Sequence, residues 1–300
     1  MMTELTNSAE EYCRGAWVEV AQMLNFSDSL REKWWCLLVR YFREDQRHYH
    51  TFEHLYELLL LAHEHKHLIT NYPVILLAIF FHDIVYNPQS PFNEEDSNDV
   101  FLQFVGECNT QQVSSLSNQV FAIIQMTKSH KLPTEANFDM QFFSDIDMAV
   151  LGSNSARYAK YAAQIRLEYN FVEFNTFCSK RADFLSSCLS SAQPLFATEL
   201  FQRERGQQAR DNIAWEHDLL QSCHCPVQLW KESNPRVTLS SSSDRSSGRS
   251  RGGGGGCVCT SRLVSLSLSL LGMVVVTALP ALLACAPSSS SFWPPRQDNL

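Results

Sequence analysis

Glycine and proline are scarce in most of this 300-residue sequence. Residues 1–222 contain only four Gly and five Pro, although these two residue types are the strongest local breakers of regular structure. No window in that stretch shows the sustained apolar/polar alternation that is typical of β-strands. The sequence therefore argues against a β-rich or loop-rich domain and predicts an all-α fold, a compact bundle of helices joined by short turns.

Apolar residues recur at helical spacing in several windows. Pro73 precedes a run, 74–86, that is apolar almost all round, which predicts the central buried helix of the bundle. The full set of predicted helices covers residues 9–25, 29–43, 51–66, 74–86, 94–105, 113–128, 141–151, 155–190 (with a break inside it left open) and 194–221.

Basic residues and targeting signals are also scarce. Residues 1–230 hold 17 Lys and Arg against 29 Asp and Glu, which argues against nucleic acid as a partner because phosphate backbones require clustered basic groups. The N-terminus has neither the basic nor the apolar stretch of a secretory signal. We therefore expect a cytoplasmic protein with reduced thiols.

The composition changes after Trp230. We expect residues 1–230 to form one globular domain, residues 231–262 to be a disordered Ser/Gly/Arg-rich linker, and residues 287–300 to be disordered. Residues 263–286 carry no charge and have about the length that spans a bilayer. They form either a tail anchor, the only feature that suggests a membrane, or an atypical appended end.

Several histidines and aspartates lie in apolar segments that are predicted to form helices. His50 and His54 are four residues apart, so on a helix they project from one face. His82 and Asp83 follow 28 residues later within the apolar run. An unpaired imidazole beside an unpaired carboxylate would be costly to bury there. A divalent metal satisfies both groups, because neutral His and ionised Asp are natural ligands.

A third acidic element completes the pattern, since residues 143–148 (FSDIDM) place carboxylates in a mostly apolar helix. The order H…HD…D resembles the HD superfamily of metal-dependent phosphohydrolases, and in particular a branch known as predicted metal-dependent HD phosphohydrolases. The matching segments are RHYHTFEHL (47–55), AIFFHDIVYNP (78–88), NEEDS (93–97), MTKSH (126–130), FSDIDMAVLG (143–152), RLEY (166–169) and ARDNIAWE (209–216). They span residues 40–220, so the resemblance implies an HD-type helical domain.

The resemblance implies roles for individual residues. His54, His82, Asp83 and Asp147 match the four metal ligands, with Asp145 as the alternative to Asp147. The pair Tyr49-His50 followed by His54 is similar to the YHN motif and second His of cyclic-nucleotide phosphodiesterases. In those enzymes the first His protonates the leaving oxygen and the second binds metal, which implies that His50 is a general acid.

Four further residues have two interpretations each. His130 either binds a second metal or phosphate, or is an exposed His at a helix end. Glu94 either holds metal-bound water or is a helix-start carboxylate facing the macrodipole. Lys128 and Arg181 are either phosphate contacts or salt-bridged surface charges.

The implied function is hydrolysis of a phosphomonoester or phosphodiester of a small phosphorylated substrate, with a nucleotide favoured only by the habit of the family. One or two divalent ions, Mn²⁺, Mg²⁺, Fe or Zn²⁺, would activate water, and Asp83 would orient that water. The alternative is a non-catalytic metal- or ligand-binding module that retains the fold. The sequence gives no indication of the oligomeric state.

Overall fold

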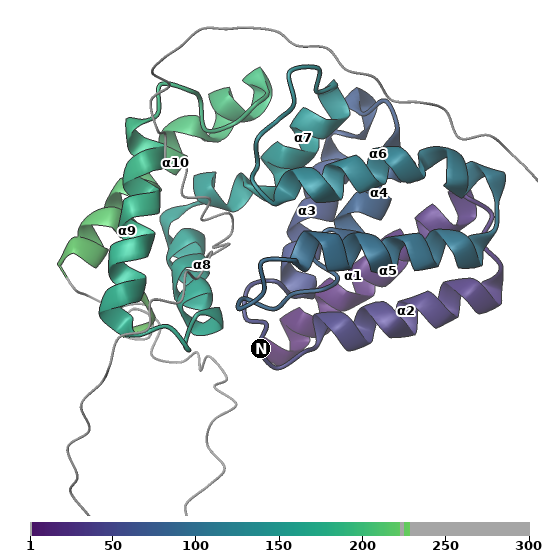
Figure 1. Ribbon diagram of the computed structural model, residues 1–300, viewed down its shortest axis with the longest axis horizontal. Coiled ribbons are helices and arrows are strands. Elements are labelled where there is room, and N and C mark those ends of the chain that lie inside the picture. Colours follow the sequence, from purple (N-terminus) through teal and green to yellow (C-terminus); the bar gives the residue numbers. More distant parts are fainter. Residues whose placement is uncertain (1, 223–224, 229–300) are drawn as a thin grey trace, which may run out of the picture.

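The computed structural model describes residues 2–222 and 225–228 of the chain (Figure 1). Every regular element in these ranges is a helix, which confirms the predicted all-α fold. The elements are α1 (Met2–Met23), α2 (Asp28–Phe42), α3 (Phe52–Glu64), η1 (Lys66–Leu68), α4 (Tyr72–Phe81), α5 (Asn93–Cys108), α6 (Gln111–Thr127), α7 (Phe138–Asp147), η2 (Ala149–Gly152), α8 (Ser155–Glu168), α9 (Phe174–Ser190) and α10 (Glu199–Gln221).

The helices form two groups. Figure 1 shows α1 to α6 gathered on one side and α8 to α10 on the other. The short pair α7 and η2 connects the groups, since α7 packs against α3 and α6 while η2 packs against α8 and α10. At Gly152, a Cβ atom would lie 2.5 Å from the Cβ of Arg205, so this close approach of η2 to α10 requires glycine. The connecting pair carries Asp147, which places that carboxylate between the two groups.

Helix α4 is the centre of the first group. Every residue from Val74 to Phe81 is at most 1% exposed, and the helix packs against α1, α3, α5 and α6. Phe81 also belongs to an aromatic cluster with Trp17, Trp34 and Phe104. The predicted central buried helix is confirmed.

The prediction that this helix continues to residue 86 is wrong. It ends at Phe81, with His82 as its C-cap and Asp83 in the turn that follows. The buried Arg47 explains why: its guanidinium donates to the carbonyls of Asp83 and Ile84, at 2.8 Å each. The chain therefore turns towards the segment before α3, and His82 and Asp83 occupy a helix end and a turn.

The other predicted helices are confirmed with shifts at their ends. The break left open in 155–190 lies between α8 and α9, where the Glu173 side chain accepts hydrogen bonds from Asn175 and Thr176. The prediction for 141–151 is α7 followed by the 3-10 turn η2. The final helix begins at Glu199 because Thr198 caps it, accepting from the N–H of Phe201.

Within residues 2–222 and 225–228, no helix is both long and apolar enough to cross a bilayer. The predicted linker 231–262, the apolar segment 263–286 and the end 287–300 lie outside the described residues.

The second group of helices contains a buried ion pair. Arg181 of α9 donates from Nε and Nη2 to the carboxylate of Glu216 on α10, at 2.9 and 3.1 Å, and neither side chain is exposed. Tyr158 of α8 donates its hydroxyl to the same carboxylate. Both interpretations of Arg181 from the sequence are therefore wrong: it is neither a surface charge nor available to phosphate, and it joins α8, α9 and α10.

We predict that Arg181→Met lowers the free energy of unfolding by about 3–5 kcal/mol, because the Glu216 carboxylate is left in the core without its cationic partner. Lys180→Met, one residue away and exposed, is the matched control and should change it little. The double variant Arg181→Met/Glu216→Met should regain a large part of the loss. Urea titration measures all three; a loss in Arg181→Met no larger than in the control would contradict this role.

Candidate metal centre

Three helix ends deliver the candidate ligands to one buried point. His54 lies in the first turn of α3, His82 caps the end of α4, and Asp147 is the last residue of α7. The three side chains are at most 4% exposed. A ligand atom from each lies within 4.8 Å of the others, which marks the group as able to hold a metal ion.

The atoms that face one another are all hydrogen-bond acceptors or potential acceptors. The Nε2 atoms of His54 and His82 are 3.2 Å apart. Asp147 Oδ1 lies 3.2 Å from Nε2 of His54 and 3.5 Å from Nε2 of His82. On His82, Nδ1 lies 3.0 Å from the carbonyl of Ile79 and donates to it, so in the neutral ring the Nε2 lone pair points into the cluster.

Asp83 forms the rim of this cluster. Its Oδ2 lies 3.1 Å from Nε2 of His82 and 3.9 Å from Nε2 of His54, and its side chain is 19% exposed. It is therefore the most solvent-accessible of the four predicted ligands. The structure brings all four together, and Asp83 is the one among them whose side chain is partly exposed.

The arrangement fits a divalent ion. Ligand atoms about 2.1 Å from one ion lie roughly 3.0–3.4 Å apart in octahedral or tetrahedral geometry, close to the separations of 3.2 and 3.5 Å among His54, His82 and Asp147. Asp147 Oδ1 is buried and has no hydrogen-bond partner among the described residues. A buried carboxylate oxygen in that state requires a positive charge beside it.

The electrostatics of the cluster lead to the same conclusion. Burial alone would lower the pKa of His82, but the carboxylates of Asp83 and Asp147 outweigh burial and raise that pKa well above its usual value. Burial would raise the pKa of Asp147, yet His82 and His54 hold it well below the usual range. The two carboxylates thus favour a positive charge within the cluster. That charge is either a proton on an imidazole or a metal ion bound by all four groups.

Asp145 does not face the cluster, which decides between the two aspartates of α7. Its carboxylate accepts from the N–H groups of Ala197 and Thr198 and from the Thr198 hydroxyl, at 2.6–2.8 Å. Two positions along a helix differ by about 200°, so these side chains point in nearly opposite directions. Asp147 faces His54 and His82, whereas Asp145 holds the start of α10.

His50 lies beside the cluster. The spacing predicted that it shares a helix face with His54, and this prediction is wrong. Helix α3 begins only at Phe52, because the Thr51 side chain caps it by accepting from the N–H of Glu53. His50 therefore belongs to the preceding turn. Its Nε2 is 3.8 Å from Asp83 Oδ2, its ring stacks on Tyr86, and it is not part of the group that could hold a metal.

Glu168, at the end of α8, holds the His50 segment in place and was given no role from the sequence. One of its oxygens accepts from three consecutive backbone N–H groups, those of residues 48–50, at 2.7–3.0 Å. The other lies 2.8 Å from His50 Nδ1 and accepts from the Tyr86 hydroxyl. Although burial opposes ionisation, His50 and the backbone N–H groups lower the pKa of Glu168 to about 2.

Consequently Nδ1 of His50 is occupied by a carboxylate and Nε2 faces Asp83. The signal for Glu168 in the sequence was its place in the segment RLEY (166–169), which carried the family resemblance without a role. Arg47 was similarly hidden in RHYHTFEHL: it donates to the carbonyl of His50 at 3.2 Å as well as to that of Asp83.

The His130 side chain is only 11% exposed, which excludes the exposed-histidine interpretation. It lies in the turn that follows α6, with a positive φ of 49°, and its N–H donates to the carbonyl of Met126. This backbone turn directs the ring inwards, where Nε2 lies 3.8 Å from Asp147 Oδ2. His130 is thus adjacent to the cluster, beside the second oxygen of Asp147.

Glu94 and Lys128 are not brought into the cluster. Glu94 lies in the first turn of α5 with Oε2 buried and without a hydrogen-bond partner among the described residues, and burial raises its pKa to about 7. Lys128 contacts the carboxylate of Glu95 and donates to the carbonyl of Pro91. Of its two interpretations from the sequence, the salt bridge is therefore the one that the structure shows.

Comparisons of the chain with protein-family models, with curated proteins and with solved structures found no match. The resemblance to the HD superfamily therefore stays a prediction carried by the motifs and by the arrangement described above.

We predict that Asp147→Asn weakens Mn²⁺ binding at least tenfold, because a ligand should matter more than the outer partners whose loss costs roughly 10–100-fold. Asp145→Asn, two residues away on the same helix, should keep Mn²⁺ affinity and lower stability by about 1–2 kcal/mol through its weaker hold on Ala197 and Thr198. Calorimetric Mn²⁺ titration and urea unfolding separate the two effects. Equal loss of Mn²⁺ from both variants would contradict the assignment of Asp147.

Proposed function

We propose that this chain is a metal-dependent phosphohydrolase that cleaves a phosphomonoester or phosphodiester. The observation that carries the proposal is the buried His54–His82–Asp147 group, with the accessible Asp83 at its rim and His50 beside it. A divalent cation at such a group supplies Lewis acidity to the phosphoryl oxygens and lowers the pKa of a water molecule that attacks phosphorus.

The protein's own groups divide the remaining work. Asp83 is placed to accept a hydrogen bond from the attacking water, because its Oδ2 lies at the cluster and its side chain is partly exposed. His54 and His82, fully buried, would hold the cation and have no access to substrate. Asp147 balances the positive charge from within the protein.

His50 is placed to protonate the leaving group. Glu168 accepts a hydrogen bond at Nδ1 and favours a proton on the ring, while Nε2 faces the Asp83 side of the cluster. As the bond between phosphorus and the leaving oxygen breaks, a proton passes from Nε2 to that oxygen, so the product departs as a neutral alcohol. Glu168 positions His50 and compensates its charge.

We expect His50→Ala to leave Mn²⁺ occupancy intact and to reduce the turnover of an alkyl phosphoester by roughly 10²–10⁴-fold, the usual worth of a general acid. A nitrophenyl phosphoester should recover much of this activity, because nitrophenolate departs without a proton. His54→Ala should lose metal, and its activity should not recover with either substrate.

His48→Ala is the matched control for His50→Ala. His48 is two residues before His50 and contacts Glu168 through its backbone N–H, which the substitution keeps. It should retain metal and turnover. If His50→Ala and His54→Ala lose metal equally, His50 is a ligand and the acid role is wrong. If the native chain binds Mn²⁺ stoichiometrically but hydrolyses no phosphoester in a broad screen, the protein is instead the non-catalytic metal-binding module considered above.

A further inference from the structure

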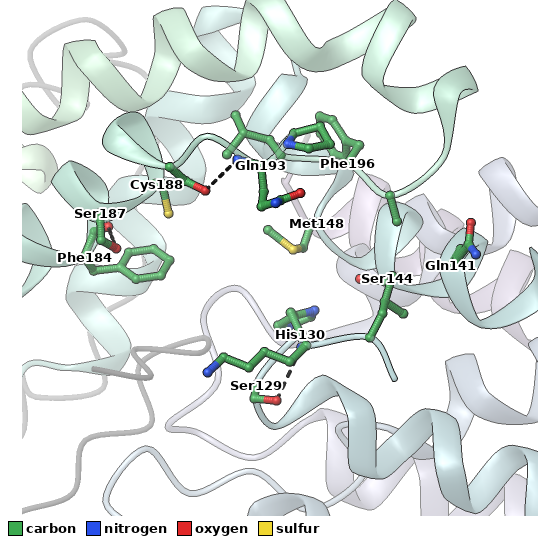
Figure 2. A pocket seen from close by; sticks show the side chains of 16 residues that line it. Ser129, His130, Gln141, Ser144, Met148, Phe184, Ser187, Cys188, Gln193 and Phe196 are labelled. Atoms are coloured by element: carbon green, nitrogen blue, oxygen red, sulfur yellow. Dashed lines mark hydrogen bonds between the residues drawn. The ribbon is translucent and has the colours of Figure 1, made fainter. Parts of the chain in front are cut away.

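A pocket of about 820 Å³ adjoins the candidate metal centre at His130. It lies between the segment after α6, the outer face of α7 and the loop that joins α9 to α10. Figure 2 shows the side chains of His130, Met148, Phe184 and Gln193 around one central space. Its volume is in the range that holds a small organic molecule.

The pocket meets the metal centre at His130. His130 lines the pocket while its Nε2 lies 3.8 Å from Asp147 Oδ2. Ser144 and Met148, three residues before and one residue after Asp147, also line it. A molecule seated in the pocket would therefore be about one side chain away from the ligands.

The chemistry of the lining is unusual for this acidic domain. Among the described residues that line the pocket, none carries a carboxylate, and Lys131 and His130 are the only ones with a basic group. Apolar side chains of Leu132, Met148, Phe184, Leu195 and Phe196 alternate with neutral hydrogen-bonding groups of Ser129, Gln141, Ser187 and Gln193. Such a lining favours an uncharged group with both apolar surface and a few polar atoms.

Phe184 is the best-placed apolar contact. It is partly exposed at the pocket, and behind it lies the guanidinium of Arg181, 5.7 Å from the ring centroid. Because Arg181 is itself fixed by Glu216, the ring has a rigid support. A planar group packed against Phe184 would gain apolar burial without ordering a flexible side chain.

We infer that this pocket binds the organic portion of the substrate, and that this portion is an uncharged, ring-sized group. The inference rests on the proposed function, since it names the substrate class of that same site. Phe184 and Met148 provide its apolar contacts, beside which an anionic group would lose its hydration, and Gln193 provides a neutral polar contact.

Three alkyl phosphates test the inference in the Mn²⁺-loaded full chain, because their leaving alcohols differ little in acidity: methyl phosphate, naphthylmethyl phosphate and 4-carboxybenzyl phosphate. We expect kcat/KM for naphthylmethyl phosphate to exceed that for methyl phosphate by at least about 100-fold, since even one methylene-sized apolar contact contributes roughly 10–200-fold. The negative charge of 4-carboxybenzyl phosphate should place it well below naphthylmethyl phosphate.

Two variants locate the effect. Phe184→Ala should lower the ratio of kcat/KM for naphthylmethyl phosphate to kcat/KM for methyl phosphate by roughly tenfold. Phe171→Ala, at an exposed phenylalanine outside the pocket, should leave this ratio unchanged. Gln193→Lys should raise kcat/KM for 4-carboxybenzyl phosphate relative to naphthylmethyl phosphate, a gain that loss of folding cannot produce.

Binding of naphthylmethylphosphonate and methylphosphonate, measured by calorimetry, separates this inference from the proposed function. If no phosphate ester is hydrolysed but the larger phosphonate binds more tightly and Phe184→Ala removes the difference, the pocket stands and the hydrolase proposal fails. If the esters are hydrolysed but the large and small compounds react and bind equally, or Phe184→Ala affects both alike, the pocket inference is overturned.

Discussion

The buried approach of two imidazoles to the carboxylate of Asp147 is the constraint on which the surrounding architecture depends. Nε2 of His54 and Nε2 of His82 lie 3.2 Å apart and share Asp147 Oδ1 as a neighbour, with Asp83 completing the set. Burying two carboxylates and two imidazole nitrogen lone pairs together in a helical core would be strongly unfavourable without a positive charge beside them. A bound cation would make the same atoms a stabilising link between α3, α4 and α7.

Other carboxylates hold the backbone around this point. Glu168 joins the end of α8 to the His50 turn, and Asp145 joins α7 to the start of α10. Asp139, at the start of α7, accepts from the backbone N–H groups of residues 70 and 71 just before α4. Each of these acidic groups satisfies N–H donors that a loop would otherwise bury. Many of the domain's conspicuous acidic residues thus fix the loops that carry the site and do not themselves take part in it.

Features of the fold and the site that depend on neighbouring residues could be predicted from the sequence, whereas features that depend on distant partners could not. Helical periodicity located the helices, and the apolar run at 74–86 identified the central one, because burial of a whole helix is visible in composition. Its end was missed because the stop comes from Arg47, distant in sequence. The role of Glu168 and the burial of Arg181 against Glu216 also depend on partners 35 or more residues away. Spacing placed His50 on a helix, whereas the Thr51 cap places it before one.

The central claim is that His54 and His82 coordinate a divalent cation through Nε2, and Mn²⁺ bound to the full chain tests it most directly. Electron spin echo spectra of the Mn²⁺-loaded protein report the nitrogen nuclei bonded to the ion. The account predicts stoichiometric Mn²⁺ with coupling from two imidazole nitrogens, reduced to one in His82→Ala where metal is still retained. Tightly bound Mn²⁺ without imidazole coupling, or no stoichiometric Mn²⁺ in a folded chain, would contradict it.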